Sequence, residues 1–93
     1  MENNYVIFTF HSTHLALEFE GLLKNIGLEV KIIPVPRKIS SSCGLAGRIM
    51  AEDFEKTKLA CENNNIEFEA VYSYSESRKE FKELISWEKS NKQ

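Results

Sequence analysis

Hydrophobic and polar positions recur along this chain with two different periods, and these periods predict strands and helices. Residues 5–10 (YVIFTF) form an unbroken β-branched and aromatic run, which is typical of a central strand buried on both faces. An amphipathic helix is expected next, because apolar side chains then recur every three or four residues, at Leu15, Phe19, Leu22, Leu23 and Ile26. Ser12 or Thr13 can cap its start, and Gly27 stands where a left-handed residue commonly ends a helix.

Two further strands are expected in the middle of the chain. Residues 28–35 alternate apolar with charged side chains, which predicts a half-buried strand, and Pro34 and Pro36 favour an edge position for it. Residues 43–51 (CGLAGRIMA) carry little side-chain volume, because they include two glycines and two alanines. We expect a third strand here, over which another part of the chain approaches closely.

The C-terminal half predicts one more helix, one more strand and a charged tail. A second helix can begin at Glu52 or Asp53 and end near Asn64, where consecutive asparagines favour a turn. Residues 66–72 alternate in the strand period, with one solvated face. From Glu76 onward, the pattern favours a charged C-terminal helix.

The resulting order β-α-β-β-α-β predicts an α+β protein with a ferredoxin-like split sandwich in residues 1–74, and residues 75–93 as an extra helix packing on it. Right-handed crossovers then place the start of the third strand at the same end of the sheet as the start of the first helix. Cys43 is therefore expected to face residues 11–14 across that end. The sheet face left open is expected to pack against the C-terminal helix or against a second subunit in a homodimer.

Composition narrows the function classes. The chain has 93 residues with 12 basic and 14 acidic side chains, so one domain with no broad nucleic-acid surface is expected. Its two cysteines cannot form a disulfide scaffold. The polar N-terminus lacks the basic start of a signal peptide, and no apolar run reaches membrane-spanning length. We therefore expect a cytoplasmic protein with free thiols and no membrane partner.

The candidate chemistry lies in residues 34–48, which hold both prolines, three consecutive serines and Cys43 but no acidic residue. Cations and N–H donors stabilise a thiolate, so Cys43 is the candidate catalytic residue. The residues expected to hold an anion beside it are Arg37, Ser41, Ser42, Gly44, Ser12, Thr13 and Arg48. The alternative for Cys43 is a small buried residue, and packing is the expected role of Cys61.

Two histidines lie near the predicted start of the first helix. His11 and His14 could act as a base or, with Cys43, supply three ligands to zinc or copper. Their spacing matches no structural metal signature, so we favour the simpler interpretation in which His11 ends a strand and His14 is solvated. No metal and no cofactor are expected.

Residues 36–44 carry the pattern P-R-x-I-S-x-x-C-G, and residues 10–20 carry F-x-S-T-x-x-A-L-x-x-E. Together these patterns resemble a small bacterial family of unknown function whose members are described as selenium/sulfur carrier-like proteins. The resemblance covers about residues 5–74. It implies that Cys43 carries sulfur or selenium as a persulfide or selenosulfide and passes it between partner proteins.

The leading hypothesis is therefore a carrier or accessory protein, rather than a free-standing enzyme, whose partners donate or accept sulfur or selenium at Cys43. Arg37, Ser41, Ser42 and the first turn of the helix would hold the anion. A non-covalent regulatory module that binds a small anion or nucleotide at the same end is one alternative. A His/Cys metal-binding protein is another. The sequence leaves open whether the cargo is sulfur or selenium.

Overall fold

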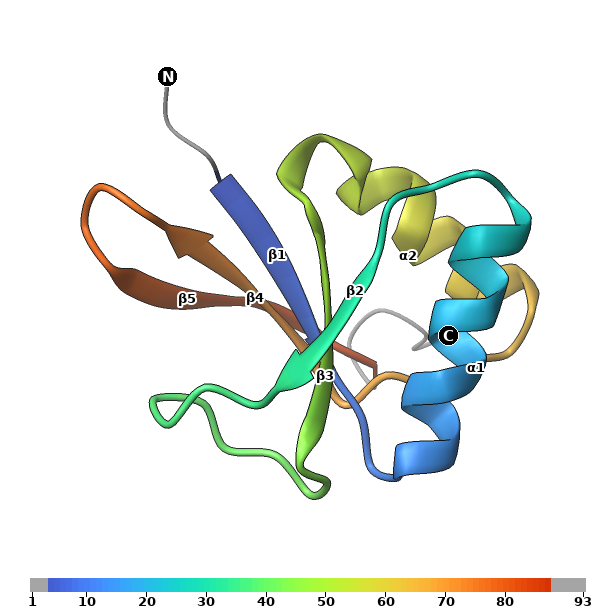
Figure 1. Cartoon of the computed structure of the whole chain (residues 1–93), viewed down its shortest axis with the longest axis horizontal. Helices are drawn as coiled ribbons and strands as arrows, with labels where there is room; N and C mark the ends of the chain where they lie inside the picture. Colours follow the sequence, from blue (N-terminus) through green and yellow to red (C-terminus); the bar gives the residue numbers. More distant parts are fainter. Residues whose placement is uncertain (1–3, 88–93) are drawn as a thin grey trace.

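One antiparallel sheet organises the computed structural model, which describes residues 4–87 (Figure 1). Its strands are β1 (Asn4–Thr9), β2 (Lys31–Pro34), β3 (Leu45–Met50), β4 (Ala70–Ser75) and β5 (Glu80–Ser86). They lie in the order β2-β3-β1-β4-β5, and every neighbouring pair is antiparallel. The predicted α+β class is confirmed, with β1 at the centre and the proline-containing β2 at an edge.

Two helices pack against the same face of this sheet (Figure 1). They are α1 (Thr13–Asn25) and α2 (Phe54–Asn63), the second preceded by a short 3-10 turn. The Ser12 side chain accepts a hydrogen bond from the Leu15 N–H at 3.2 Å, and Gly27 follows α1 with a φ of +81°. Both predicted ends of the first helix are therefore confirmed. Neither described helix has the length and apolar content needed to cross a bilayer.

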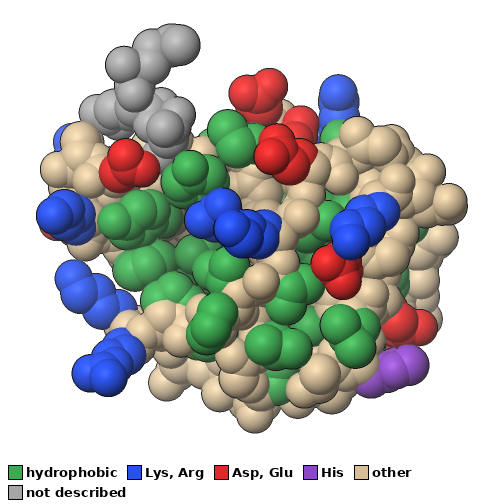
Figure 2. Space-filling model, in the orientation of Figure 1, with side chains coloured by type: hydrophobic (Ala, Val, Ile, Leu, Met, Phe, Trp, Pro, Cys, Tyr) green, Lys and Arg blue, Asp and Glu red, His purple; other side chains and the backbone are tan. Residues whose placement is uncertain are grey.

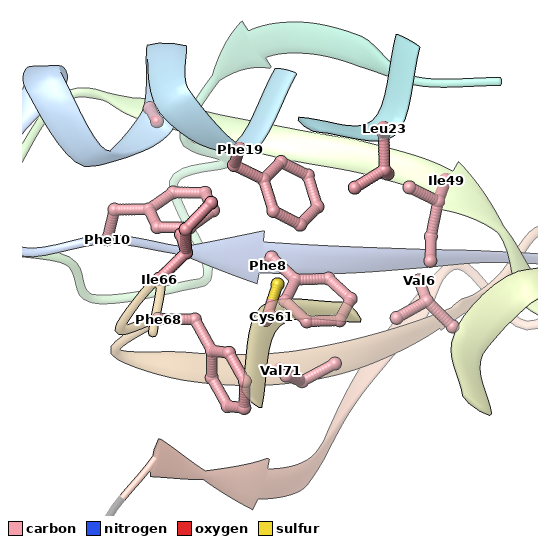
Figure 3. Packing of buried hydrophobic residues seen from close by; sticks show 11 residues of the cluster. Val6, Phe8, Phe10, Phe19, Leu23, Ile49, Cys61, Ile66, Phe68 and Val71 are labelled. Carbon is pink, nitrogen blue, oxygen red and sulfur yellow. The ribbon is translucent and has the colours of Figure 1, made fainter. Parts of the chain in front are cut away.

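Aromatic side chains fill the main core between the helices and the sheet (Figure 3). The Phe8 ring lies 5.0 Å from that of Phe19 on α1 and 5.2 Å from that of Phe68, centroid to centroid. Cys61 on α2 is fully buried in this core. Burial, with a smaller effect of the neighbouring Glu62 charge, raises the pKa of the Cys61 thiol to about 12. The predicted packing role of Cys61 is confirmed.

The close approach predicted over the third strand is found at Gly47. A Cβ built on Gly47 would overlap the ring of Phe19, so the glycine lets α1 pack directly onto the β3 backbone. Gly44, by contrast, has open space beside it, with no atom within 4 Å of such a Cβ. The low side-chain volume of residues 43–51 therefore serves helix packing at Gly47.

The opposite face of the sheet, called here the helix-free face, carries a smaller core. Ile7, Ile39 and Ala46 are buried there, with Ile33 and Phe81 among the half-buried side chains packed against them. Ile39 belongs to the loop between β2 and β3. This loop turns back on itself, and the Ile39 N–H donates to the Pro36 carbonyl. Part of the face that was expected to need the C-terminal helix or a second subunit is therefore covered by this loop.

The predicted C-terminal helix is wrong for residues 80–86, which form β5. Lys79 adopts a left-handed conformation with a φ of 54°, and its N–H donates to the Ser75 carbonyl, closing a tight turn that returns the chain antiparallel to β4. Phe81 then packs on Tyr74, with ring centroids 4.8 Å apart. Cross-strand pairing therefore overrides the helical spacing of residues 81–85. The predicted helix also included residues 88–93, which lie outside the described residues.

Boundaries of the fourth strand also differ from the prediction. β4 begins at Ala70, whereas alternation suggested a start at Ile66. Ile66 and Phe68 are nevertheless buried in the main core, so their apolar character reflects packing of the segment between α2 and β4.

Candidate functional site

The loop that contains Cys43 and the end of β1 meet at one end of the sheet. Val35 N–H donates to the Gly44 carbonyl at 3.0 Å, which closes the base of the loop between β2 and β3. Ser41 Oγ lies 3.3 Å from the carbonyl oxygen of Phe10, and Ser42 Oγ lies 3.4 Å from His11 Nδ1. The two segments therefore lie together at the expected end of the sheet. Ser41 and Ser42 make the contacts between them.

A carboxylate that the sequence did not single out joins these segments. Glu69 Oε1 accepts hydrogen bonds from Ser41 Oγ and the Ser42 N–H, each at 3.1 Å, and Oε2 accepts one from Ser42 Oγ at 3.0 Å. Glu69 is fixed in turn by its own N–H, which donates to the Thr9 carbonyl at 2.6 Å. We call Glu69 and these two serines the Glu69 clamp. The strand-like alternation of residues 66–72 had suggested only a solvated face for Glu69.

The clamp lowers the pKa of the Glu69 carboxyl. Partial burial acts to raise the pKa of Glu69, but hydrogen bonds from the Ser42 N–H and hydroxyl and from the Ser41 hydroxyl, with the nearby His11, outweigh it. The pKa of Glu69 is therefore lowered. His11 Nδ1 lies 3.8 Å from Glu69 Oε2. The serine donors expected to hold an external anion thus already bind an internal one.

Cys43 lies directly after the clamp in the chain. Its side chain is half-buried against the edge of the main core, and its S–H donates to the Leu45 carbonyl at 3.3 Å. Cys61, the other thiol, is fully buried. Of the two free cysteines, Cys43 is therefore the one that solvent reaches.

The helix-start residues predicted for the site have other roles or solvated positions. Ser12 Oγ accepts the N-cap hydrogen bond of α1, and Thr13 is the exposed first residue of that helix. His14 Nε2 lies 3.6 Å from Glu18 Oε2, one helical turn along, with its side chain mostly in solvent. The expectation of a solvated His14 is confirmed. Within residues 4–87, no group of three or more His, Cys, Asp and Glu side chains is placed to hold a metal ion.

The predicted arginines do not converge on Cys43. Arg37 is exposed on the loop between β2 and β3. Arg48 stacks its guanidinium over the ring of Tyr5, 4.5 Å from the centroid, near the start of β1 and so towards the other end of the sheet. Gly44 has open space around it and no close-packed atom to accommodate. Placing Arg48 beside Cys43 was wrong. Cys43 packs against the main core on the helix side of the sheet, whereas strand register directs the Arg48 side chain onto the helix-free face.

Fold and site together describe a small α+β domain that presents one solvent-reachable thiol beside a hydrogen-bonded loop. Residues 5–73 match the model of the family described as "Putative Se/S carrier protein-like". This match spans well over half of the chain and includes Cys43 and Glu69, so the chain belongs to that family. No curated protein and no solved structure matches the chain. Membership supports a role in carrying sulfur or selenium.

Proposed function

We propose that this protein carries sulfur or selenium on the Cys43 sulfur atom, as a persulfide or a selenosulfide. The observation that carries the proposal is the contrast between the two thiols: Cys43 is half-buried at a loop end, whereas Cys61 is fully enclosed by the main core. A covalent carrier must expose its sulfur to a donor and then to an acceptor. The carrier role itself comes from membership of the family.

Loading Cys43 is a thiol exchange that balances without an external oxidant. The Cys43 thiolate attacks the outer sulfur of a donor persulfide, a new S–S bond forms at Cys43, and the S–S bond within the donor breaks. The donor leaves as a thiolate and takes up the proton that Cys43 lost. A donor selenosulfide would pass on selenium in the same way. Loss of the Cys43 proton also breaks its hydrogen bond to the Leu45 carbonyl, which frees the sulfur to turn towards solvent.

In this proposal the Glu69 clamp positions the loop that bears Cys43. Hydrogen bonds to one carboxylate hold the two residues that precede the cysteine, and the Ser41 hydroxyl shares its single hydrogen between that carboxylate and the Phe10 carbonyl at the end of β1. A loop held in this way loses less conformational entropy when a partner docks. Glu69 thus acts through the loop and is a positioning residue.

We further propose a cytoplasmic location, partner proteins that load and unload Cys43, and a ferredoxin-like arrangement of the first four strands. The order β2-β3-β1-β4 with two helices on one face supports that arrangement. β5 then extends the sheet beyond β4.

Mass spectrometry of the protein after incubation with a low-molecular-weight persulfide tests the proposal. We expect the intact mass to rise by one sulfur atom, the added atom to map to the peptide that contains Cys43, and a reductant to remove it. The Cys43→Ser variant should gain nothing, whereas Cys61→Ala should load normally. An unmodified Cys43, or equal loading of Cys43→Ser, would refute the carrier mechanism.

A further inference from the structure

Two basic side chains lie opposite each other on neighbouring strands. Lys31 on β2 pairs with Arg48 on β3, and the same row continues to Ile7 on β1, a residue of the small core on the helix-free face. Like charges at directly opposite positions destabilise a sheet. No carboxylate among residues 4–87 forms an ion pair with either cation, and the Arg48 guanidinium rests on the Tyr5 ring instead. This pair would be stabilised by an anion from outside the chain.

Two cavities meet at Arg48 and Tyr5. The first, of about 280 Å³, is lined by Lys31, Arg48 and Tyr5. The second, of about 320 Å³, shares Arg48 and Tyr5 and continues over the aromatic pair Tyr74 and Phe81. Figure 2 shows hydrophobic side chains gathered on this side of the molecule with Lys and Arg side chains among and around them. A basic group and an apolar surface therefore adjoin in one hollow.

We infer that the helix-free face holds a second, non-covalent site for a small organic anion, with Lys31 and Arg48 binding the anionic group and the aromatic pair contacting a flat apolar body. The cavity volumes are at the lower end for small-molecule sites, so a single ring system with one acidic group is the class that fits. Glu29 lines the first cavity and Glu76 the second. Their negative charges disfavour multiply charged ligands, so the ligand is a monoanion such as an aromatic carboxylate or sulfonate.

This site is separate from the carrier chemistry. Cys43 and the Glu69 clamp lie where β1 ends, whereas Tyr5 lies near the start of β1, and neither Cys43 nor Glu69 lines either cavity. Binding at the helix-free face therefore does not depend on the proposed function, and each can fail without the other.

Titration of the isotope-labelled full chain with naphthalene-1-sulfonate, an aromatic monoanion with a single fused ring system, tests the inference. We expect saturable binding in which the amide signals of Tyr5, Arg48 and Phe81 shift and those of Ser41 and Ser42 do not. Arg48→Gln should weaken binding about tenfold, because it removes a charge-assisted contact. Lys56→Gln, which removes one positive charge from an exposed position on α2, should bind as the unmodified protein does.

Several outcomes would overturn the inference. They are the absence of saturable binding, shifts that map to other parts of the molecule, equal affinity of Arg48→Gln and Lys56→Gln, and inorganic phosphate binding as tightly as the sulfonate. Should Arg48→Gln melt early in circular dichroism, Lys31→Gln provides the same comparison. It removes the other cation of the pair from the exposed edge strand, and unchanged affinity there would equally exclude the site.

Discussion

Ser42 donates both its backbone N–H and its hydroxyl to the carboxylate of Glu69, at 3.1 and 3.0 Å, although the two residues are 27 positions apart. This contact ties the loop before β3 to the segment before β4. The thiol of Cys43 is attached to the tied end of that loop. Stability of the loop and presentation of the thiol are therefore linked through one side chain.

Because of the clamp, the free energy of unfolding should fall as the pH is lowered into the acid range. The pKa of Glu69 is lowered in the folded protein, so the ionised form stabilises the fold above the ordinary carboxyl range, and this contribution is lost as pH falls through the lowered value. We expect Glu69→Gln to lose about 1 kcal/mol at pH 7, a small value because the site is partly solvated. Urea unfolding at pH 7 and pH 3 checks this.

In the same experiment, Glu69→Gln should lose less stability than the unmodified protein on going to the lower pH. The exposed Glu67→Gln is the matched control, two residues away. Identical pH profiles for the Glu69 variant and the unmodified protein would show that the carboxylate charge does not stabilise the loop.

The two glycines near the start of β3 should respond differently to an added methyl group. Gly47→Ala would drive a Cβ into the Phe19 ring, and we expect it to cost about 1–3 kcal/mol. Gly44→Ala meets open space and should change the free energy of unfolding by less than about 0.5 kcal/mol. Thermal melting of both variants decides the matter; a Gly47→Ala protein as stable as Gly44→Ala would contradict the close packing of α1 on β3.

Two buried threonines make a second matched pair. Thr9 Oγ1 donates to the Ala70 carbonyl and accepts from the Ala70 N–H, each at 3.2 Å, so Thr9→Val should destabilise the fold by about 1–3 kcal/mol. Thr57 Oγ1 is buried and has no hydrogen-bond partner among the described residues. Thr57→Val, of nearly the same shape, should therefore be neutral or stabilising. Denaturant midpoints measure both, and an equal loss in the two variants would argue against this difference.

The buried thiol predicts an alkaline limit to stability. The folded pKa of Cys61 is raised to about 12, so its stabilising contribution is complete below the ordinary thiol pKa and is lost as pH rises towards the folded value. Cys61→Ala should be less stable at pH 7, because it leaves a cavity, yet should lose less stability between pH 8 and pH 10. Parallel pH profiles for the two proteins would exclude this origin of the alkaline loss.

Periodicity predicted the elements whose partners lie close in sequence. The cap at Ser12, the left-handed Gly27 and the buried strand from Tyr5 all follow from local spacing and were found. The C-terminal strand was mistaken for a helix because Phe81, Leu84 and Ile85 have helical spacing. Only the pairing of Phe81 with Tyr74 across the turn reveals its true conformation.

The meeting of the Cys43 loop with the end of β1 was predicted, but the carboxylate that joins them was not. Topology correctly brought the Cys43 loop to the end of β1, since crossover rules fix which strand ends meet. Glu69 was missed because hydrogen bonds between distant loops leave no periodic trace. One signal was present: serine hydroxyls in an acid-free stretch need an acceptor, and Glu69 follows the predicted buried Phe68 near the same end. Arg48 was misplaced because local charge was counted without the strand register.

The bond between Thr9 and Ala70 joins residues 61 positions apart, and it belongs to the central pairing of the sheet. During synthesis, β1 leaves the ribosome long before β4 is made. The edge of β1 that pairs with β4 therefore stays unpaired while β2 and β3 form a hairpin along its other edge. Successive nascent chains of increasing length should therefore resist protease only after residue 75 has emerged. Until then, chaperone binding to the exposed aromatic strand is the expected fate of the growing polypeptide.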